Sequence, residues 1–219
     1  MLSFLCLYRI GVWPQGTGLI ERGWNAGGCC TGSVKDDVQF TRDMLAWVDT
    51  NMCRDAGRTF AAGFSNGGFF SNRLACELSN EFRAIAPGSG PLSFSGGLAT
   101  STKGFNECKP EYATSVIHFH GTLDATVPYN GEKINGWPSA VDDHENWRAR
   151  NNCGPTGSDV EVYTTSTTSC MRYENCSESS FVELCTVKGM GHHWAGGTDD
   201  EGHGDIVATD YVFDVFGKF

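Results

Sequence analysis

A serine at position 65 is flanked by glycine two residues before and two residues after it, in the stretch "GFSNG" over residues 63–67. The short apolar run "RTFAAG" leads into this stretch and is typical of a buried strand, whereas "GGFFSNRLACELS" after it has helical spacing. A serine in a sharp turn between strand and helix presents its hydroxyl above the sheet, and glycine suits both flanks because the helix folds back across the strand. The stretch therefore predicts a strand-turn-helix unit with Ser65 as a nucleophile at the turn.

Strand-like and helix-like segments alternate along the rest of the chain. Ser33 and Asp36 have capping-box spacing before a helical pattern that runs through Val48, and Ser139 is predicted to cap a second helix. Further strands are predicted at "FRAIAPG", "SVIHFHG", "VEVYTT" and "FVELCTV", and a closing helix at "DIVATDYVFDVFG". This alternation predicts an α/β fold whose mostly parallel sheet is covered by helices on both faces.

A serine nucleophile of this kind needs a base and an acid, which follow in the order Ser, then Asp or Glu, then His on loops at the carboxyl edge of the sheet. Asp124 comes a few residues after the strand "SVIHFHG", and His192 and His193 follow the strand "FVELCTV". The acid would orient the imidazole, and the imidazole would act first as general base and then as general acid. Spacing alone does not decide between His192 and His193.

Other roles for these acids and histidines fit the sequence as well. Asp124 is also suited to binding backbone amides in a turn. Asp142 and Asp143 compete for the role of acid, but they lie in the first turn of a predicted helix, where carboxylates are favoured by the helix dipole. His118 and His120 fall within an apolar strand, which predicts residues of the core or residues that support the site from behind.

Charge and length exclude several classes of function. The 219 residues suffice for one hydrophobic core, and no linker-like stretch divides them, which predicts a single domain over residues 1–219. A formal net charge of −10 argues against nucleic acid or an anionic membrane as partner. No apolar run approaches the roughly 20 residues that span a bilayer. A monomer acting on a small-molecule or polymeric substrate is expected.

Ten cysteines point to disulfides and to an extracellular, secreted protein, because they do not fall into the paired spacing of structural zinc sites. The start "MLSFLCLYRIGVW" lacks the basic segment of a secretory leader and is equally compatible with a strand. A loop over residues 191–205 gathers His, Asp and Glu, but its irregular spacing favours a solvated acidic loop. No metal and no cofactor are expected.

Five blocks in order resemble the family of poly(3-hydroxybutyrate) depolymerases and feruloyl or acetylxylan esterases, carbohydrate esterase family 1. They are "WNAGGCC", "DDVQFTRDML", "GFSNGGFFSNRLACELSNEFRAIAP", "HFHGTLDATVPYNG" and "GMGHHWAGG". The resemblance implies an α/β-hydrolase, a serine esterase with Ser65, Asp124 and His192 as its catalytic triad. It also implies that the amide of Asn66 helps to stabilise the oxyanion. Aromatic side chains expected to line the substrate cleft are Trp24, Phe64, Tyr129 and Trp194.

One element of the family is not matched. Related proteins begin with a strand that ends in a His-Gly loop carrying a second oxyanion donor, whereas "FLCLYRIGVWPQG" resembles the segment after that loop. The sequence therefore predicts an N-terminally shortened α/β-hydrolase. Since loss of such a donor typically lowers turnover by about 10²- to 10³-fold, a non-catalytic or weakly active hydrolase-fold protein with an incomplete oxyanion hole is the alternative.

Overall fold

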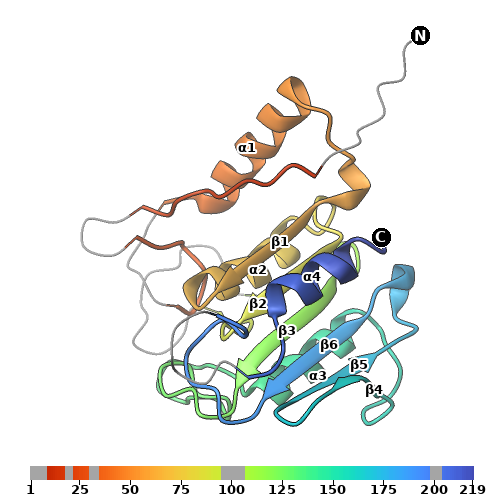
Figure 1. The fold of residues 1–219 in the computed structure, drawn as a ribbon. Helices are drawn as coiled ribbons and strands as arrows, with labels where there is room; N and C mark the ends of the chain where they lie inside the picture. The colour runs from red at the N-terminus through yellow and green to blue at the C-terminus, as the bar shows by residue number, and fades with distance from the viewer. Residues whose placement is uncertain (1–8, 18–21, 30–34, 95–106, 198–203) are drawn as a thin grey trace.

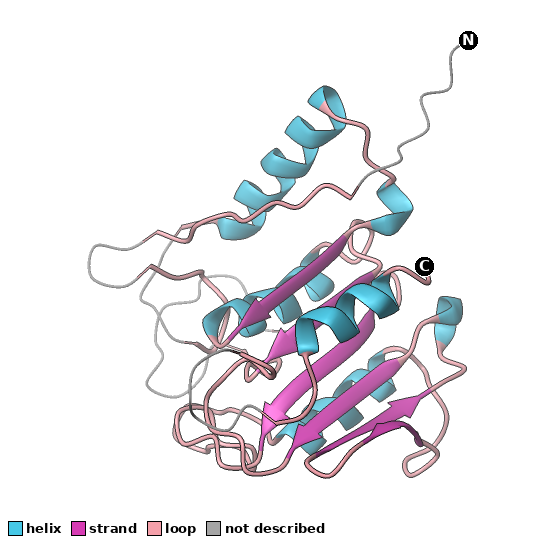
Figure 2. Cartoon of the chain, in the orientation of Figure 1, coloured by secondary structure: helices cyan, strands magenta, loops and turns pink. Residues whose placement is uncertain are grey.

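A six-stranded sheet forms the centre of the protein. The computed structural model describes residues 9–17, 22–29, 35–94, 107–197 and 204–219. Within them the sheet has the order β1-β2-β3-β6-β5-β4, and β1, β2, β3 and β6 run parallel (Figures 1 and 2). β5 runs antiparallel to β6, and β4 runs antiparallel to β5. The strands are β1 Phe60–Phe64, β2 Ala84–Gly88, β3 Ser115–Gly121, β4 Val160–Thr164, β5 Thr168–Tyr173 and β6 Val182–Val187.

Helices cover both faces of this sheet, as the sequence predicts. Two of them, α2 and α3, lie behind the sheet in Figure 1, and α4 crosses its front. Their contacts agree with this picture: Val116 of β3 packs in a cluster with Trp147 of α3, whereas its neighbour Ile117 packs in the cluster of α4. Alternate residues of a strand point to opposite faces, so a fully buried strand such as β3 serves both layers. The helices are α1 Asp37–Asn51, α2 Asn66–Glu77, α3 Ala140–Arg150 and α4 Ala208–Phe216, with short 3₁₀ helices at Ala56–Arg58 and Ser177–Ser179.

Of the two helix caps predicted from the sequence, one is confirmed and the other is wrong. Ser139 caps α3 through its side chain, which accepts a hydrogen bond from the amide of Asp142. At α1 the prediction of Ser33 as the cap is wrong, because the helix begins at Asp37 and the side chain of Asp36 accepts from the amide of Gln39. An aspartate is as good a cap as a serine, so the pattern identified the helix and misplaced its start.

β5 has no counterpart among the predicted strands. Its sequence "TSCMRY" follows a run of threonine and serine and lacks a clear apolar alternation. The strand is specified by its partners, because it pairs with β6 on one side and β4 on the other and is joined to β6 by the disulfide Cys170–Cys185.

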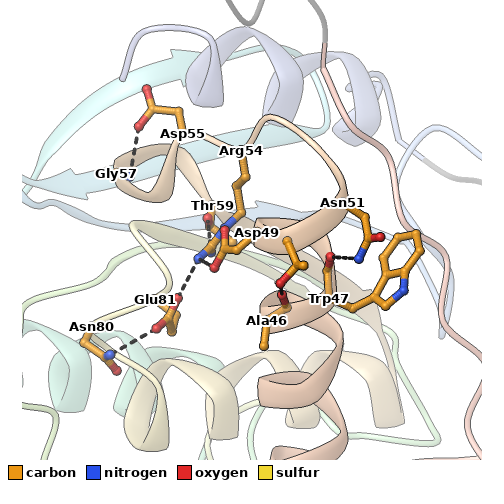
Figure 3. Close-up of polar contacts among 11 residues, drawn as sticks. Ala46, Trp47, Asp49, Asn51, Arg54, Asp55, Gly57, Thr59, Asn80 and Glu81 are labelled. Carbon is orange, nitrogen blue, oxygen red and sulfur yellow. Dashed lines mark hydrogen bonds and ion pairs between the residues drawn. The ribbon is translucent and has the colours of Figure 1, made fainter.

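Arg54 fixes the connection from α1 to the first strand. Its guanidinium donates to the carboxylate of Asp49 at the end of α1, to the hydroxyl of Thr59 before β1, and to Glu81 after α2 (Figure 3). The pKa of Arg54 lies above its ordinary value, and the hydrogen bond to Asp49 is the largest cause. Burial alone would lower this pKa. These contacts join three segments at the amino end of β1.

Disulfides link segments that are close in the sequence. Cys76–Cys108 joins α2 to the segment before β3, and Cys153–Cys176 joins the segment after α3 to that before β6. Together with Cys170–Cys185 they confirm that this is a disulfide-bonded protein, as the cysteine content predicts. No helix in the described ranges combines the length and the apolarity needed to cross a membrane.

Candidate active site

Ser65 lies at the turn between β1 and α2, as the sequence predicts. Its backbone has φ 53° and ψ −120°, a conformation in the left-handed half of the map that costs a non-glycine residue energy. The turn is held from both sides, because the Ser65 amide donates to the carbonyl of Gly88 at 2.8 Å and its carbonyl accepts from the amides of Gly68 and Phe69. The strained turn presents the hydroxyl at the carboxyl edge of the sheet.

The glycines around this turn differ in what they do. A side chain at Gly63 would clash with the backbone of Gly67, so glycine is required two residues before the serine. The expectation that Gly67 is needed for the same reason is wrong, since a methyl group there would meet nothing within 4 Å. Two other glycines are in tight contact instead: a methyl group at Gly68 would lie 2.8 Å from the carbonyl oxygen of Gly88, and one at Gly90 would lie 2.5 Å from that of Ser65.

Asp124 follows β3 in a turn that its own side chain stabilises. Its Oδ1 accepts hydrogen bonds from the amides of Thr126 at 2.9 Å and Val127 at 2.8 Å. Its Oδ2 lies 2.8 Å from Nδ1 of His192. The two roles considered for this residue are therefore combined in one carboxylate: one oxygen binds the turn, and the other faces the histidine.

Backbone hydrogen bonds tie the loop after β3 to the loop after β6, which carries His192. The amide of Thr122 donates to the carbonyl of Val187 at 3.0 Å, and the amide of Leu123 donates to that of Met190 at 3.0 Å. A side chain at Gly121 would clash with the Met190 carbonyl, so this glycine permits the close approach. The acid and the histidine are thus fixed relative to each other by the backbone.

His192, and not His193, makes the contacts that a catalytic base requires. Its Nε2 lies 2.8 Å from Oγ of Ser65, while its Nδ1 faces Asp124. The ring of Phe64 packs against the imidazole with centroids 4.7 Å apart. In the tautomer that fits these neighbours, Nδ1–H donates to Asp124 and Nε2 accepts from the Ser65 hydroxyl.

Hydrogen-bond donors keep Asp124 ionised although it is buried. Burial is the largest influence and by itself would raise the pKa of this carboxyl. Donation from His120, from His192 and from the amide of Val127 outweighs burial and holds the pKa of Asp124 well below its usual range. An ionised acid behind the imidazole is the arrangement that stabilises a transient imidazolium.

Asn66 begins α2 directly after the serine. The first amides of a helix have no partner within the helix, so the Asn66 amide is available to a developing negative charge. Its side chain has a contact that the sequence did not suggest: Oδ1 accepts from the Trp24 amide at 2.7 Å, and Nδ2 donates to the carbonyls of Trp24 and Cys29. The side chain thereby attaches the segment around Trp24 to the nucleophile turn.

The four aromatic residues predicted to line a substrate cleft are all partly exposed, but their contacts differ. Phe64 lies against His192. Trp24 stacks on Phe70 with centroids 5.0 Å apart, and Trp194 packs against Phe119. The hydroxyls of Tyr129 and Thr186 share a hydrogen bond of 2.8 Å, and the Tyr129 ring packs against His120. Phe64 thus packs against a residue of the candidate triad, and substrate binding by any of the four stays a prediction.

The competing acids lie elsewhere. Asp142 is bound to the cap residue Ser139, and Asp143 accepts from the amide of Leu92. Of the acidic loop considered for a metal, residues 198–203 lie outside the described part. Asp205, which is described, accepts from the threonine and serine side chains of residues 165–168.

A shallow depression of about 360 Å³ lies at the opposite edge of the sheet, near the amino ends of the strands. Its polar groups are occupied: Arg83 donates to the carbonyl of Glu178, and the Glu178 carboxylate accepts from the amide of Ala113. Ser65 is at the carboxyl edge, where parallel α/β sheets bind their ligands. We therefore place the candidate site at Ser65 and not in this depression.

Sequence comparison relates the chain to feruloyl esterases. It is 36% identical to "Feruloyl esterase B" of Piromyces equi over 182 residues, which cover 80% of this chain and 32% of that protein. It is 31% identical to "Probable feruloyl esterase C" of Aspergillus niger over 126 residues, 57% of this chain and 42% of the other. The matched part of the chain thus spans 32% and 42% of the length of these two relatives. No family model matches it.

Structural comparison supports the fold. "Acetyl xylan esterase from Aspergillus awamori" superposes with a TM-score of 0.58 over 83% of this chain and 67% of that one, at 14% sequence identity. Likeness at this identity establishes the α/β-hydrolase-like fold alone. Together with the sequence relatives it confirms the resemblance to feruloyl and acetylxylan esterases, whereas the resemblance to poly(3-hydroxybutyrate) depolymerases stays a prediction.

Proposed function

Because this chain is related to the feruloyl esterases over four-fifths of its length, we propose that it is a serine esterase that hydrolyses carboxylic esters. One observation carries the proposal: two contacts of 2.8 Å join Ser65 to His192 and His192 to Asp124. A hydroxyl is a weak nucleophile at neutral pH unless an adjacent base takes its proton, and this arrangement provides the base and the acid that orients it.

The reaction would proceed through an acyl-enzyme. Oγ of Ser65 attacks the ester carbonyl while Nε2 of His192 takes its proton, and Asp124 stabilises the imidazolium. The amide of Asn66 donates to the oxyanion. The C–O bond to the alcohol then breaks, and the leaving oxygen takes the proton from His192. A water molecule, deprotonated by the same histidine, releases the acid and restores Ser65. These steps need no cofactor and no metal.

We propose feruloyl or acetyl esters of plant polysaccharide as substrates, ahead of polyesters of the poly(3-hydroxybutyrate) type. The reason is the similarity of this chain to a feruloyl esterase and of its fold to an acetyl xylan esterase. Phe64 supports an aromatic acyl group because its ring lies against the catalytic histidine. Trp24, Tyr129 and Trp194 would complete the cleft. The three disulfides whose cysteines both lie in the described ranges favour an extracellular protein. We also propose that the chain acts as a single domain and as a monomer.

A fluorophosphonate probe tests the nucleophile directly. We expect covalent labelling of the wild-type chain, loss of labelling in Ser65→Ala, and a fall in ester turnover of at least about 10⁴-fold, because the attacking oxygen is removed. Ser71→Ala is the matched control, since Ser71 lies in α2 and its hydroxyl bonds the carbonyl of Gly67. Labelling that persists in Ser65→Ala would sink the assignment.

A panel of esters tests the substrate class. Methyl ferulate, acetylated xylan and a hydroxybutyrate oligomer are compared with a short-chain p-nitrophenyl ester. Turnover of the ferulate or acetyl substrate that disappears in Ser65→Ala supports the proposal. A chain that is neither labelled nor active on any of these esters would instead be the non-catalytic hydrolase-fold protein.

A further inference from the structure

His120 is a fully buried imidazole in β3 that touches the acid of the proposed triad from behind. Its Nε2 lies 2.8 Å from the carbonyl oxygen of Val127 and 3.4 Å from Oδ2 of Asp124. A carbonyl oxygen only accepts hydrogen bonds, so Nε2 must carry a hydrogen. The N–H therefore donates to the Val127 carbonyl, and Oδ2 of Asp124 is a second, more distant acceptor beside the same nitrogen.

The other ring nitrogen defines the protonation state. Nδ1 of His120 is buried and has no hydrogen-bond partner in the described part of the chain. A proton there would create a buried donor without an acceptor, which is costly. The ring therefore presents a hydrogen on Nε2, the nitrogen next to the Val127 carbonyl and Oδ2 of Asp124.

The turn after Asp124 is closed by reciprocal bonds. Oδ1 of Asp124 accepts from the amide of Val127, while the carbonyl of the same residue accepts from His120. Oδ2 lies between Nδ1 of His192 on one side and Nε2 of His120 on the other. The amides of Thr126 and Val127 hold Oδ1, so His120 is the further group that restricts the carboxylate, beside Oδ2 and behind the turn.

We propose that His120 is a positioning residue that holds Oδ2 of Asp124 toward His192 through its Nε2–H. The inference rests on the proposed function, because it assigns His120 to the same triad. Its own orientation is fixed by packing: Tyr129 meets the ring edge-on with centroids 5.5 Å apart, and the Tyr129 hydroxyl is bonded to Thr186 of β6. Because packing fixes the orientation of the His120 ring, the ring also restricts where the oxygens beside its Nε2 can lie.

His118 provides a matched control on the same strand. It points to the same face of β3 as His120 and is equally buried, but its Nδ1 lies 3.1 Å from Asp143 of α3. Its ring lies 5.2 Å from that of His120, centroid to centroid, but its acidic partner is Asp143 of α3 and not Asp124.

The kinetic test compares His120→Phe, His120→Gln and His118→Phe with the wild type on a p-nitrophenyl ester. We expect His120→Phe to lower kcat by about 10- to 100-fold with little change in KM, the effect of losing a hydrogen bond to a charged group. His120→Gln keeps an N–H at the end of its side chain and should recover much of this loss. His118→Phe should lower thermal stability and leave kcat close to that of the wild type. Equal kcat in His120→Phe and wild type would overturn the inference.

A second readout is independent of any substrate. Proton NMR follows the Nδ1–H resonance of His192, which reports its hydrogen bond to Asp124. We expect this resonance to shift or broaden in His120→Phe and to stay in place in His118→Phe. Should His120→Phe not fold, His120→Met also lacks the donor and adapts its shape to the site. If the resonance is unchanged in the variant without the donor, the inference is wrong. This outcome is distinct from failure of the proposed function, which would show as absent labelling of Ser65 in the wild type.

Discussion

At the scale of single residues, Ser65 is the point at which chemistry and backbone energetics conflict. Its φ of 53° is favourable for glycine and unfavourable for any residue with a Cβ atom. The proposed mechanism nevertheless needs a hydroxyl there, because Oγ of Ser65 lies 2.8 Å from Nε2 of His192. The fold therefore carries strain at the residue that the proposed mechanism depends on.

We predict that Ser65→Gly is more stable than Ser65→Ala by about 1 kcal/mol, because glycine adopts this conformation without a steric penalty. Both variants lack the nucleophile, so the comparison isolates the backbone. Urea unfolding of the two proteins measures the difference. At Ser71, inside α2, the order should reverse, since glycine destabilises a helix interior by a similar amount. Equal stability of the two Ser65 variants would mean that the turn is not strained.

At the scale of elements, the site depends on two loops that leave neighbouring parallel strands. The loop after β3 carries Asp124 and the loop after β6 carries His192, and β3 pairs with β6 along its length. Gly121 at the end of β3 lets the first loop approach the carbonyl of Met190 in the second. The separation of acid and base is therefore set by backbone contacts between the two loops, and Gly121 permits them.

Gly121→Ala should separate these loops. The added methyl group collides with the Met190 carbonyl, which we expect to lower the free energy of unfolding by about 1 to 3 kcal/mol. Displacement of His192 from Asp124 should also lower ester turnover, by up to about 10²-fold. Gly57→Ala is the control, because a methyl group there makes only ordinary contact with Asp55. If Gly121→Ala loses stability but keeps full turnover, the loop contact does not position the histidine.

Elements with a strong local pattern were predictable from the sequence. β3 and α3, with Ser139 as its cap, lie where the pattern places them. β5 was not predictable, since its polar sequence becomes a strand only through pairing with β4 and β6. The start of α1 was misplaced because two capping residues, Ser33 and Asp36, stand three positions apart.

The candidate site was also predictable where it has a local sequence pattern and not where it depends on distant partners. Chain order and strand ends identified Ser65 and Asp124, whereas the choice of His192 over His193 came from the resemblance. Contacts between segments distant in sequence had no local signal. The Asn66 side chain, which binds the carbonyl of Trp24 42 residues away, is an example.

At the scale of the whole molecule, two buried carboxylates make stability depend on pH in opposite directions. Burial raises the pKa of Glu183, although Arg172 and Tyr211 bond to it. Its contribution to stability therefore declines as the pH rises from its unfolded pKa through its folded pKa. Asp124 has a lowered pKa, so its contribution is complete above its unfolded value and is lost as the pH falls toward the folded value.

We predict that Asp124→Asn lowers the free energy of unfolding by about 2 kcal/mol near neutral pH, because the donors around the carboxylate favour its charged form. The difference from wild type should shrink as the pH falls below about 4, the unfolded pKa of aspartate. Denaturant unfolding at a series of pH values measures it. Asp214→Asn, at an exposed position of α4, is the reference substitution. A difference that does not change with pH would show that Asp124 is not held ionised by its neighbours.

The strained turn at Ser65 also bears on how such a sequence evolves. Selection for a stable fold alone would favour glycine at this position, and only selection for turnover would retain a serine there. A lineage in which the activity became dispensable would therefore be expected to lose the hydroxyl early. The glycines at 63, 68 and 90 should persist in the same lineage, because an inactive descendant still needs them to pack α2 against the sheet. A serine retained at this turn is therefore what the proposed activity predicts for related sequences that remain active.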